Sequence, residues 1–400
     1  MIAISQLERT KIRKQLIKEI QTLKDRKGFL IAGFPRFDRL FGRDSLIVAC
    51  QLLDWNPGIC KATLEILSQF QGKVFNDEKN EEPGKIIHET DFESWHPAGL
   101  YPFPYYGSID STPLFLILFA FYFKKTKDQK FLQNHWENIL MALHWMEECG
   151  GKDKDYFLEY KRKNPKGLFH QGWKDDFKNH LNITPPVAIV EAQGYQYLAL
   201  NEIAELAAMR REHDLVEKLK ERAASLQEEF NEKFWMEKEN YFALGLNGKK
   251  EQRKAITSNP GHCLFTGIIS EDKVEKVVKR LFEEDMWTPF GIRTHSAKEP
   301  DFDAQSYHLG SIWPHDNWII AQGLKKYGFL EEYQKIRQAL FSAHKALGYL
   351  PEYYGVTDEK IIQIPGSCHP QAWATCALFN FLGVSLQEKI TQIPSKVFRW

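Results

Sequence analysis

Helical periodicity runs through nearly the whole chain of 400 residues, and no linker interrupts it. Pro and Gly are spread through short loops, and no Ser/Gly-rich or charge-block segment divides the sequence. We therefore expect one domain spanning residues 1–400. The apolar and amphipathic segments predict helices near residues 4–25, 45–54, 59–72, 110–128, 128–149, 187–209, 212–238, 261–269, 271–283, 308–327, 329–346 and 370–384.

About a dozen helices in one domain leave two all-α architectures open, a solenoid and a closed toroid of paired helices. No repeat of 34 or 40 residues is visible, which weighs against the solenoid. Strand signals are weak, and the segment NYFALGL at 240–246 predicts at most a small hairpin. A closed ring gathers its long loops at one end, so we expect a ligand site there.

The composition excludes several classes of protein. Lys plus Arg equals Asp plus Glu at 53 each, so no field of one sign favours nucleic acid or an acidic membrane surface. The basic runs KRLFEE and KRKNPK are explained as solvated faces. The longest apolar run, residues 114–123, is too short to span a bilayer. The six cysteines form no CxxC pair and the first residues lack a signal-peptide pattern, which predicts a reduced, cytoplasmic protein.

Motifs for metals and nucleotide cofactors are missing from the sequence. It contains no HExxH, no GxGxxG after a strand, no GxxxxGK[ST] and no GxSxG. His308 and His315 are seven residues apart, but Gly310 and Pro314 interrupt the segment between them. We expect no metal site and no cofactor.

Carboxylates set among aromatic residues remain as the candidates for chemistry. Phe, Tyr and Trp make up 14% of the chain, and many lie in loops punctuated by Gly and Pro. Hydrolysis of a glycoside needs one protonated and one ionised carboxyl group across the sugar ring. The candidate segments are FPRFDRLFGRDS (34–45), YPFPYYGSIDST (101–112), GWKDD (172–176), SYHLGSIWPHDNW (306–318) and LGYLPEYYG (347–355).

Two of these carboxyl groups have settings that favour acid–base work. Asp175 follows Trp173 by two residues, and an apolar neighbour raises the pKa of a proton donor. Glu352 lies between Pro351 and two tyrosines, a setting that desolvates a carboxyl group. A toroid whose long loops share one rim allows these two side chains to face one another.

Each carboxylate also has a structural interpretation. Asp44 or Ser45 is placed to cap the helix that follows, and Asp110 to cap the next one. In the functional interpretation, Asp44 accepts hydrogen bonds from sugar hydroxyls while Arg43 fixes its position.

Nine segments, in the same order, resemble amylo-α-1,6-glucosidase-type proteins. The likeness runs from about residue 30 to residue 384 and extends to (α/α)6 glycoside hydrolases such as processing α-glucosidase I and mannosylglycerate hydrolase. The segments are AGFPRFDRLFGRDSL, EEPGKIIHE, YYGSIDSTPLFL, QGWKD, PVAIVEAQGYQY, NPGHCLFTGI, SYHLGSIWPHDNWIIAQGLKKYG, LPEYYG and CHPQAWA.

The resemblance implies an inverting exo-α-glycosidase, foremost an α-glucosidase, on an (α/α)6 toroid without cofactor. Carried over by motif, Asp175 is the general acid and Glu352 the general base. The implied substrate-binding residues are Arg43, Asp44, Tyr106, Asp110, Trp173, Gln193, Tyr195, Trp313, His315 and Gln371.

This chain departs from the family pattern beside the acid and the base. Phe41 stands where relatives usually have Trp, and Tyr353-Tyr354 where Leu-Phe is common. After the acid the chain reads Asp176-Phe177-Lys178, whereas relatives often read Ser-Gly-Asp. These departures put the identity of the small carbohydrate substrate in doubt more than the reaction.

Other functions therefore stay open at this point. One is hydrolysis of a compact charged glycoside such as mannosylglycerate or glucosylglycerate, with Arg36 or Arg39 pairing with the glycerate carboxylate. A sugar epimerase would use histidine bases, for which His88, His262, His308 and His315 are available. A sugar-binding protein without activity is the non-enzymatic alternative. The sequence does not indicate the oligomeric state.

Overall fold

The computed structural model of the chain describes residues 5–91, 101–148 and 155–383. Cys149 and both ends of the chain lie outside these ranges. The described residues form thirteen helices: α1 (Gln6–Leu23), α2 (Gly42–Leu52), α3 (Pro57–Gln69), α4 (Ser111–Thr126), α5 (Gln129–Asn134), α6 (Trp136–Glu148), α7 (Val190–Met209), α8 (His213–Lys233), α9 (Asn259–Thr266), α10 (Glu271–Leu281), α11 (Pro314–Lys326), α12 (Leu330–Leu347) and α13 (Ala372–Gly383).

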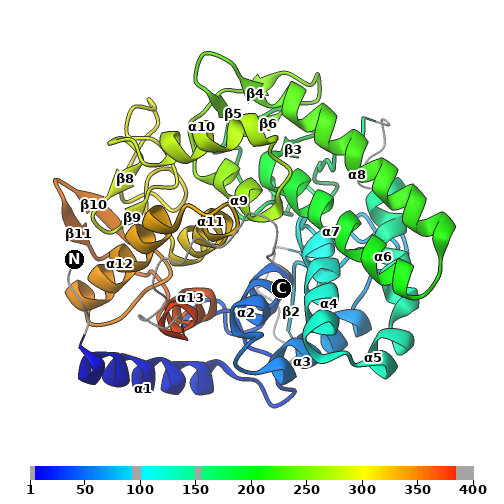
Figure 1. Cartoon of the computed structure of the whole chain (residues 1–400), viewed down its shortest axis with the longest axis horizontal. Helices are drawn as coiled ribbons and strands as arrows, with labels where there is room; N and C mark the ends of the chain where they lie inside the picture. The colour runs from blue at the N-terminus through cyan, green and yellow to red at the C-terminus, as the bar shows by residue number, and fades with distance from the viewer. Residues whose placement is uncertain (1–4, 92–100, 149–154, 384–400) are drawn as a thin grey trace.

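The helices form a closed double ring (Figure 1). The inner helices α2, α4, α7, α9, α11 and α13 each contact the next one, and α13 contacts α2 to close the ring. Each inner helix also packs on an outer partner: α3, the α5–α6 pair, α8, α10, α12 and, from the start of the chain, α1. This arrangement of paired helices confirms the predicted (α/α)6 toroid.

The sequence explains which helices are inner and which are outer. In α4, every residue from Ser111 to Phe123 is buried, as expected for a helix that is covered on all sides. In the outer helix α8, only Leu219, Ala223, Leu226, Phe230 and Asn231 are buried, at helical spacing along one face. The apolar run at 114–123 is therefore an inner wall of the ring, and no helix of the described chain is long and apolar enough to cross a membrane.

The alternation of inner and outer helices brings the N-termini of the inner helices to one end of the ring. Because each inner helix is followed by an outer helix that runs back, all six inner helices start at the same end. Ion pairs and hydrogen bonds between their first turns confirm this, for example from Arg43 at the start of α2 to Asp110 at the start of α4. Residues just before or within these first turns make up the candidate site.

Short strands connect the loops at the ring's ends. The strands are β1 (Leu40–Phe41), β2 (Glu89–Thr90), β3 (Ala188–Ile189), β4 (Trp235–Met236), β5 (Tyr241–Phe242), β6 (Gly245–Leu246), β7 (Gln252–Arg253), β8 (Trp287–Thr288), β9 (Gly291–Ile292), β10 (Gly355–Thr357) and β11 (Lys360–Ile362). All of their pairings are antiparallel. The segment 240–246 contributes to two sheets instead of closing on itself: β5 pairs with β4, and β6 lies between β3 and β7.

The predicted cap at the start of α2 is wrong. The helix begins at Gly42, so Asp44 and Ser45 lie inside its first turn and neither is the N-cap residue. Asp110 does occupy the N-cap position of α4, but its side chain makes no capping hydrogen bond. Both aspartates are therefore available for other interactions.

Candidate functional site

Arg43 organises the centre of the site. Its side chain is buried, and its Nε atom donates to Asp110 Oδ2 at 2.7 Å. Its Nη1 atom donates to Asp175 Oδ2 at 2.7 Å, and its Nη2 atom to the carbonyl of Gln171 at 3.2 Å. One guanidinium thus joins the first turn of α2 to the start of α4 and to the loop that carries Asp175.

Asp175 is the exposed carboxylate of this group. A quarter of its side chain remains accessible, whereas Asp110 is fully buried. Burial of the loop raises the pKa of Asp175 to about 6, while the charge of Arg43 and its hydrogen bond oppose that rise. A carboxyl group with this pKa can hold a proton in a weakly acidic solution and release it to a bound ligand.

Asp176, the neighbour of Asp175, has a local structural role. Its Oδ1 atom accepts a hydrogen bond from the backbone of Lys178 at 2.8 Å, which closes a turn after the acid. The charges that raise the pKa of Asp175 belong instead to Asp110 and Glu89.

Glu352 is held in a different manner. Its side chain is only 1% exposed, and Tyr307 donates its hydroxyl to Oε1 at 2.7 Å. The backbone N–H of Cys368 and the guanidinium of Arg36 approach Oε2 at 3.2 and 3.5 Å. Burial raises the pKa of Glu352, and these three donors oppose the rise because they stabilise the ionised form. Such a carboxylate is suited to accept a proton.

Asp44 and Tyr307 lie within electrostatic reach of both Asp175 and Glu352. The charges of Asp175 and of Glu352 each raise the pKa of Asp44, and each also raises the pKa of the Tyr307 hydroxyl. The fold therefore gathers Asp44, Asp175 and Glu352 in one carboxylate site, although 177 residues separate the two candidate catalytic groups in sequence, from 175 to 352.

Asp44 differs from the sequence interpretation in its protonation. Burial raises its pKa to about 8, against the opposing charge of Arg43. The carboxyl group is therefore largely neutral near pH 7 in the free protein, and it can donate one hydrogen bond as well as accept others.

Aromatic rings build a wall behind the acid loop. Trp173 lies edge-on to Trp313 and His315, with ring centroids 5.7 and 5.0 Å apart. Trp313 stacks on Tyr353 at 5.2 Å, and His315 stacks on Trp373 at 3.7 Å. Burial keeps the pKa of His315 well below its ordinary value, so this ring is neutral.

The predicted binding residues differ in where the structure places them. Gln371 lies beside Glu352, where its amide favours the ionised carboxylate. Tyr106 donates its hydroxyl to the carbonyl of Phe70, and the amide of Gln193 bonds backbone atoms of Leu158 and Ile189.

Tyr195 bonds to His262, which in turn bonds to Asp316, at 2.7 Å in each case. For Tyr106, Gln193 and Tyr195, the described residues show contacts with helix ends, loops and neighbouring helices of the ring instead of contacts with Asp175 or Glu352.

Sequence reasoning missed two contributors. Tyr307 lies in the candidate segment 306–318, where we considered Trp313 and His315. Nothing in the sequence indicated that its hydroxyl bonds Glu352, 45 residues away. Lys174, inside GWKDD, is buried and donates to the carbonyl of Thr294 at 2.6 Å, which fixes the acid loop to the loop before α11. The sequence did contain a signal for Lys174, because a charged residue stands there between Trp173 and Asp175.

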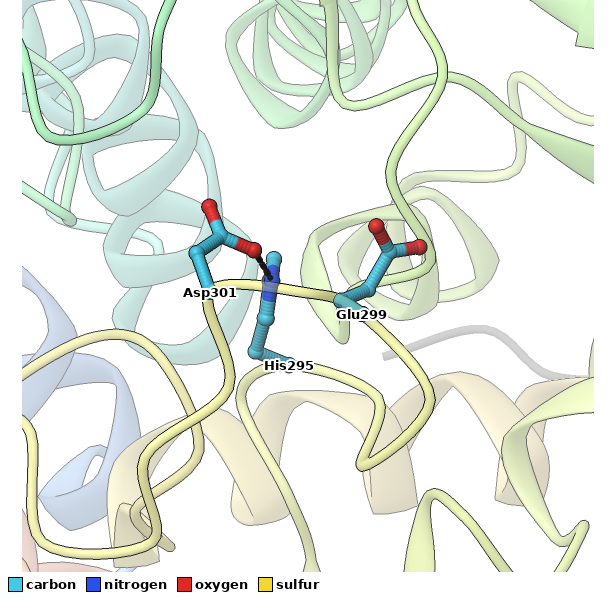
Figure 2. A group of neighbouring side chains, drawn as sticks. All are labelled: His295, Glu299 and Asp301. Atoms are coloured by element: carbon cyan, nitrogen blue, oxygen red, sulfur yellow. Dashed lines mark hydrogen bonds and ion pairs between the residues drawn. The ribbon is translucent and has the colours of Figure 1, made fainter.

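Within the described ranges, one group of side chains has the composition of a metal site. His295, Glu299 and Asp301 lie together in the loop before α11 (Figure 2). Each already has a protein partner: His295 Nε2 and Asp301 Oδ1 are 2.8 Å apart, and Glu299 accepts from the backbone of Ile256 at 2.9 Å. Glu299 and Asp301 are also partly exposed. The residues of the carboxylate site include no such group.

The sequence and the fold match a known class of enzyme domain. Residues 135–362, more than half of the chain, match the family model of the mannosylglycerate hydrolase MGH1-like glycoside hydrolase domain. The chain belongs to this family, which confirms the predicted class, a glycoside hydrolase domain. The match includes Asp175 and Glu352.

Individual relatives agree with this assignment. Mannosylglycerate hydrolases MGH1 and MGH2 of Selaginella moellendorffii are each 28% identical over 127 residues, which is 32% of this chain. The matched part spans only a quarter of the length of each of these relatives.

Solved structures show the same fold. The GH63 mannosylglycerate hydrolase from Thermus thermophilus in complex with Tris superposes with a TM-score of 0.70 at 13% identity, covering 93% of this chain and 99% of that one. The same enzyme in complex with glucose gives 0.70 at 14% identity, with the same coverage.

Proposed function

We propose that this protein is an inverting hydrolase of a compact, negatively charged α-glycoside, of which mannosylglycerate and glucosylglycerate are the examples. The observation that carries the proposal is the pair formed by Asp175 and Glu352. One carboxyl group is partly exposed with its pKa raised to about 6, and the other is buried among three donors that favour its charge. This is the division into proton donor and proton acceptor that inversion needs.

In the proposed reaction, water attacks the anomeric carbon while the bond to the leaving oxygen breaks. Glu352 takes a proton from the attacking water, and Asp175 gives its proton to the leaving oxygen. Arg43 holds Asp175 in place, and the neutral carboxyl of Asp44 bonds sugar hydroxyls. The reaction leaves Asp175 ionised and Glu352 protonated, and exchange with solvent restores both.

The charge of the substrate is argued from Arg36 and Arg39. Arg39 is largely buried and donates to Glu89 at 2.5 Å, so its charge is already matched. Arg36 is 48% exposed, and its contact with Glu352 is a long one at 3.5 Å. Arg36 is therefore the arginine placed to receive a glycerate carboxylate. The named relatives support this substrate class over the α-glucosidase that the sequence motifs favoured first.

A comparison of charged and neutral substrates tests the proposal. Mannosylglycerate and glucosylglycerate are expected to be cleaved with a higher kcat/KM than maltose, isomaltose and methyl α-glucoside. Because Arg36 also contacts Glu352, Arg36→Gln is expected to lower kcat/KM for all substrates. Beyond that shared loss, it is expected to raise KM for the glycerate substrates by about tenfold relative to the neutral ones, the scale of one charge-assisted hydrogen bond. The control, Arg26→Gln, removes an exposed arginine outside the site without this effect. Preference of the wild-type enzyme for the neutral glucosides would refute the charged-substrate proposal.

A further inference from the structure

Lys174 is a buried lysine directly before the proposed proton donor. Its side chain is 1% exposed, and its Nζ atom donates to the backbone carbonyl of Thr294 at 2.6 Å. The indole ring of Trp173 lies 5.2 Å from the same nitrogen. Within the described residues, no carboxylate forms an ion pair with this ammonium group. Burying such a group is costly, so the bond to Thr294 has to be explained by what it connects.

Thr294 is linked through the backbone to the segment that carries Glu352. The N–H and the hydroxyl of Thr294 both donate to the carbonyl of Ser311 at 2.9 Å. The next residue, Ile312, exchanges two backbone hydrogen bonds with Tyr354, at 2.8 and 3.1 Å. Tyr354 lies two residues after Glu352. A short series of backbone contacts therefore leads from the lysine to the proposed base.

The same segment also positions the tyrosine that bonds Glu352. The hydroxyl of Ser311 donates to the carbonyl of Tyr307 at 2.9 Å, and the indole of Trp313 donates to that carbonyl at 2.7 Å. The hydroxyl of Tyr307 in turn donates to Glu352. The segment that Lys174 reaches thus supports Glu352 along two paths.

On its other side, the acid loop (residues 170–176) is tied to different helices. Arg43 in α2 donates to Asp175 and to the carbonyl of Gln171. The backbone N–H of Ile109, just before α4, donates to the same carbonyl at 2.9 Å. These contacts join the loop to the starts of α2 and α4, whereas the bond from Lys174 joins it to the segments around Glu352.

We propose that the ammonium group of Lys174 is a positioning group, which holds Asp175 at the separation from Glu352 that inversion needs and releases the acid loop when it loses its proton. The inference rests on the proposed function for the roles of the two carboxyl groups. A charged donor makes a stronger hydrogen bond to a carbonyl than a neutral amine does, so deprotonation weakens the bond to Thr294.

The surroundings of Lys174 bring its titration into an accessible range of pH. Burial lowers the pKa of Lys174 to about 8, while the charges of Asp316 in α11 and Glu191 in α7 oppose that fall. The histidines that face this lysine have their own pKa values lowered by burial and, in part, by the charge of Lys174, so they titrate at lower pH. These histidines are His180, His295 and His308.

Fluorine NMR of the whole chain labelled with fluorotryptophan tests the tie without any substrate. The resonance of Trp173, assigned with Trp173→Phe, should shift between pH 6 and pH 10 with a midpoint near pH 8, as the neighbouring ammonium loses its proton. This step should be absent from Lys174→Met and present in Lys178→Met, the matched control, which removes an exposed lysine four residues further on. The step should also persist in Asp44→Asn, because the pKa of Asp44 is raised to a similar value.

Two results of the titration would overturn the proposal. One is a wild-type Trp173 resonance without a step between pH 7 and pH 9, a result that does not depend on the folding of any Lys174 variant. The other is a step that remains in Lys174→Met or disappears in Asp44→Asn.

Kinetics then test the positioning role. Lys174→Met is expected to lower kcat on mannosylglycerate about a hundredfold, the scale of a displacement of about 1 Å, with KM changed less than about threefold. On a dinitrophenyl α-mannoside, whose leaving group needs no proton from Asp175, the loss should stay within about threefold. Lys178→Met should match the wild-type enzyme on both substrates.

Equal losses of Lys174→Met on the two substrates would overturn the positioning role, because general damage to the site lowers both rates. A wild-type protein that hydrolyses neither substrate would contradict the proposed function, and the NMR titration would still decide whether Lys174 forms the tie.

Discussion

Replacing Asp175 by Asn should abolish the hydrolysis of substrates with poor leaving groups and spare those with good ones. At pH 7, a pKa of about 6 leaves about one Asp175 side chain in eleven protonated, against about one in 1,600 for an ordinary aspartate of pKa 3.8. Above pH 7, kcat/KM of the wild-type enzyme should therefore fall about tenfold per pH unit. The amide in Asp175→Asn keeps the shape of the side chain but cannot donate this proton.

The assay compares two leaving groups on the same sugar. With glycerate as the leaving group, the variant should lose about a thousandfold in kcat/KM, within the range contributed by general acids. With a dinitrophenyl leaving group, which departs without protonation, the loss should stay within about tenfold and the decline at alkaline pH should disappear. Asp176→Asn is the matched control, because its side chain accepts from the backbone of Lys178 and lies 3.9 Å from His180, and it is not among the groups that hold Asp175. Equal losses of the Asp175→Asn variant on both substrates would refute the assignment of Asp175 as the proton donor.

Three further predictions concern Tyr307, Asp44 and a buried phenylalanine of α4. Tyr307→Phe removes a donor that lowers the pKa of Glu352, so the acidic limb of the pH–rate profile should move to higher pH. An unchanged limb would show that Glu352 is not the group that titrates there. Because burial raises the pKa of Asp44 to about 8, the native state loses stability as pH rises from about 4 to about 8. Asp44→Asn should therefore raise Tm at pH 9 more than at pH 5, and equal shifts would contradict this pKa. Phe115→Ala, in the buried face of α4, should cost about 3–5 kcal/mol in denaturant unfolding, whereas Phe177→Ala, half exposed, should cost under about 1 kcal/mol.

The architecture could be predicted from the sequence because helical periodicity is a local property. The apolar run from Leu114 to Phe123 already had the pattern of a helix buried on all sides, and it proved to be an inner helix of the ring. The start of α2 could not be predicted, because Gly42 begins that helix after a two-residue strand pairing with β2, a contact distant in sequence. The split of 240–246 between two sheets depends in the same way on distant partners.

The site was predictable by residue type more than by role. Asp175 and Glu352 were found from their aromatic settings and from family motifs, and their roles remain predictions. The protonation of Asp44 and the donor Tyr307 depend on burial and on contacts that only the folded ring creates. Tyr106, Gln193 and Tyr195 were chosen by motif, and their side chains bond to framework atoms in the structure.

The first anomer released from mannosylglycerate tests the central claim most directly. Hydrolysis followed by proton NMR within the first minutes, before mutarotation, distinguishes the two outcomes. If Glu352 activates water on the face opposite to Asp175, the first product from the α-linked substrate is β-mannose together with glycerate. Release of α-mannose first, or of no sugar from any charged or neutral α-glycoside, would contradict the account.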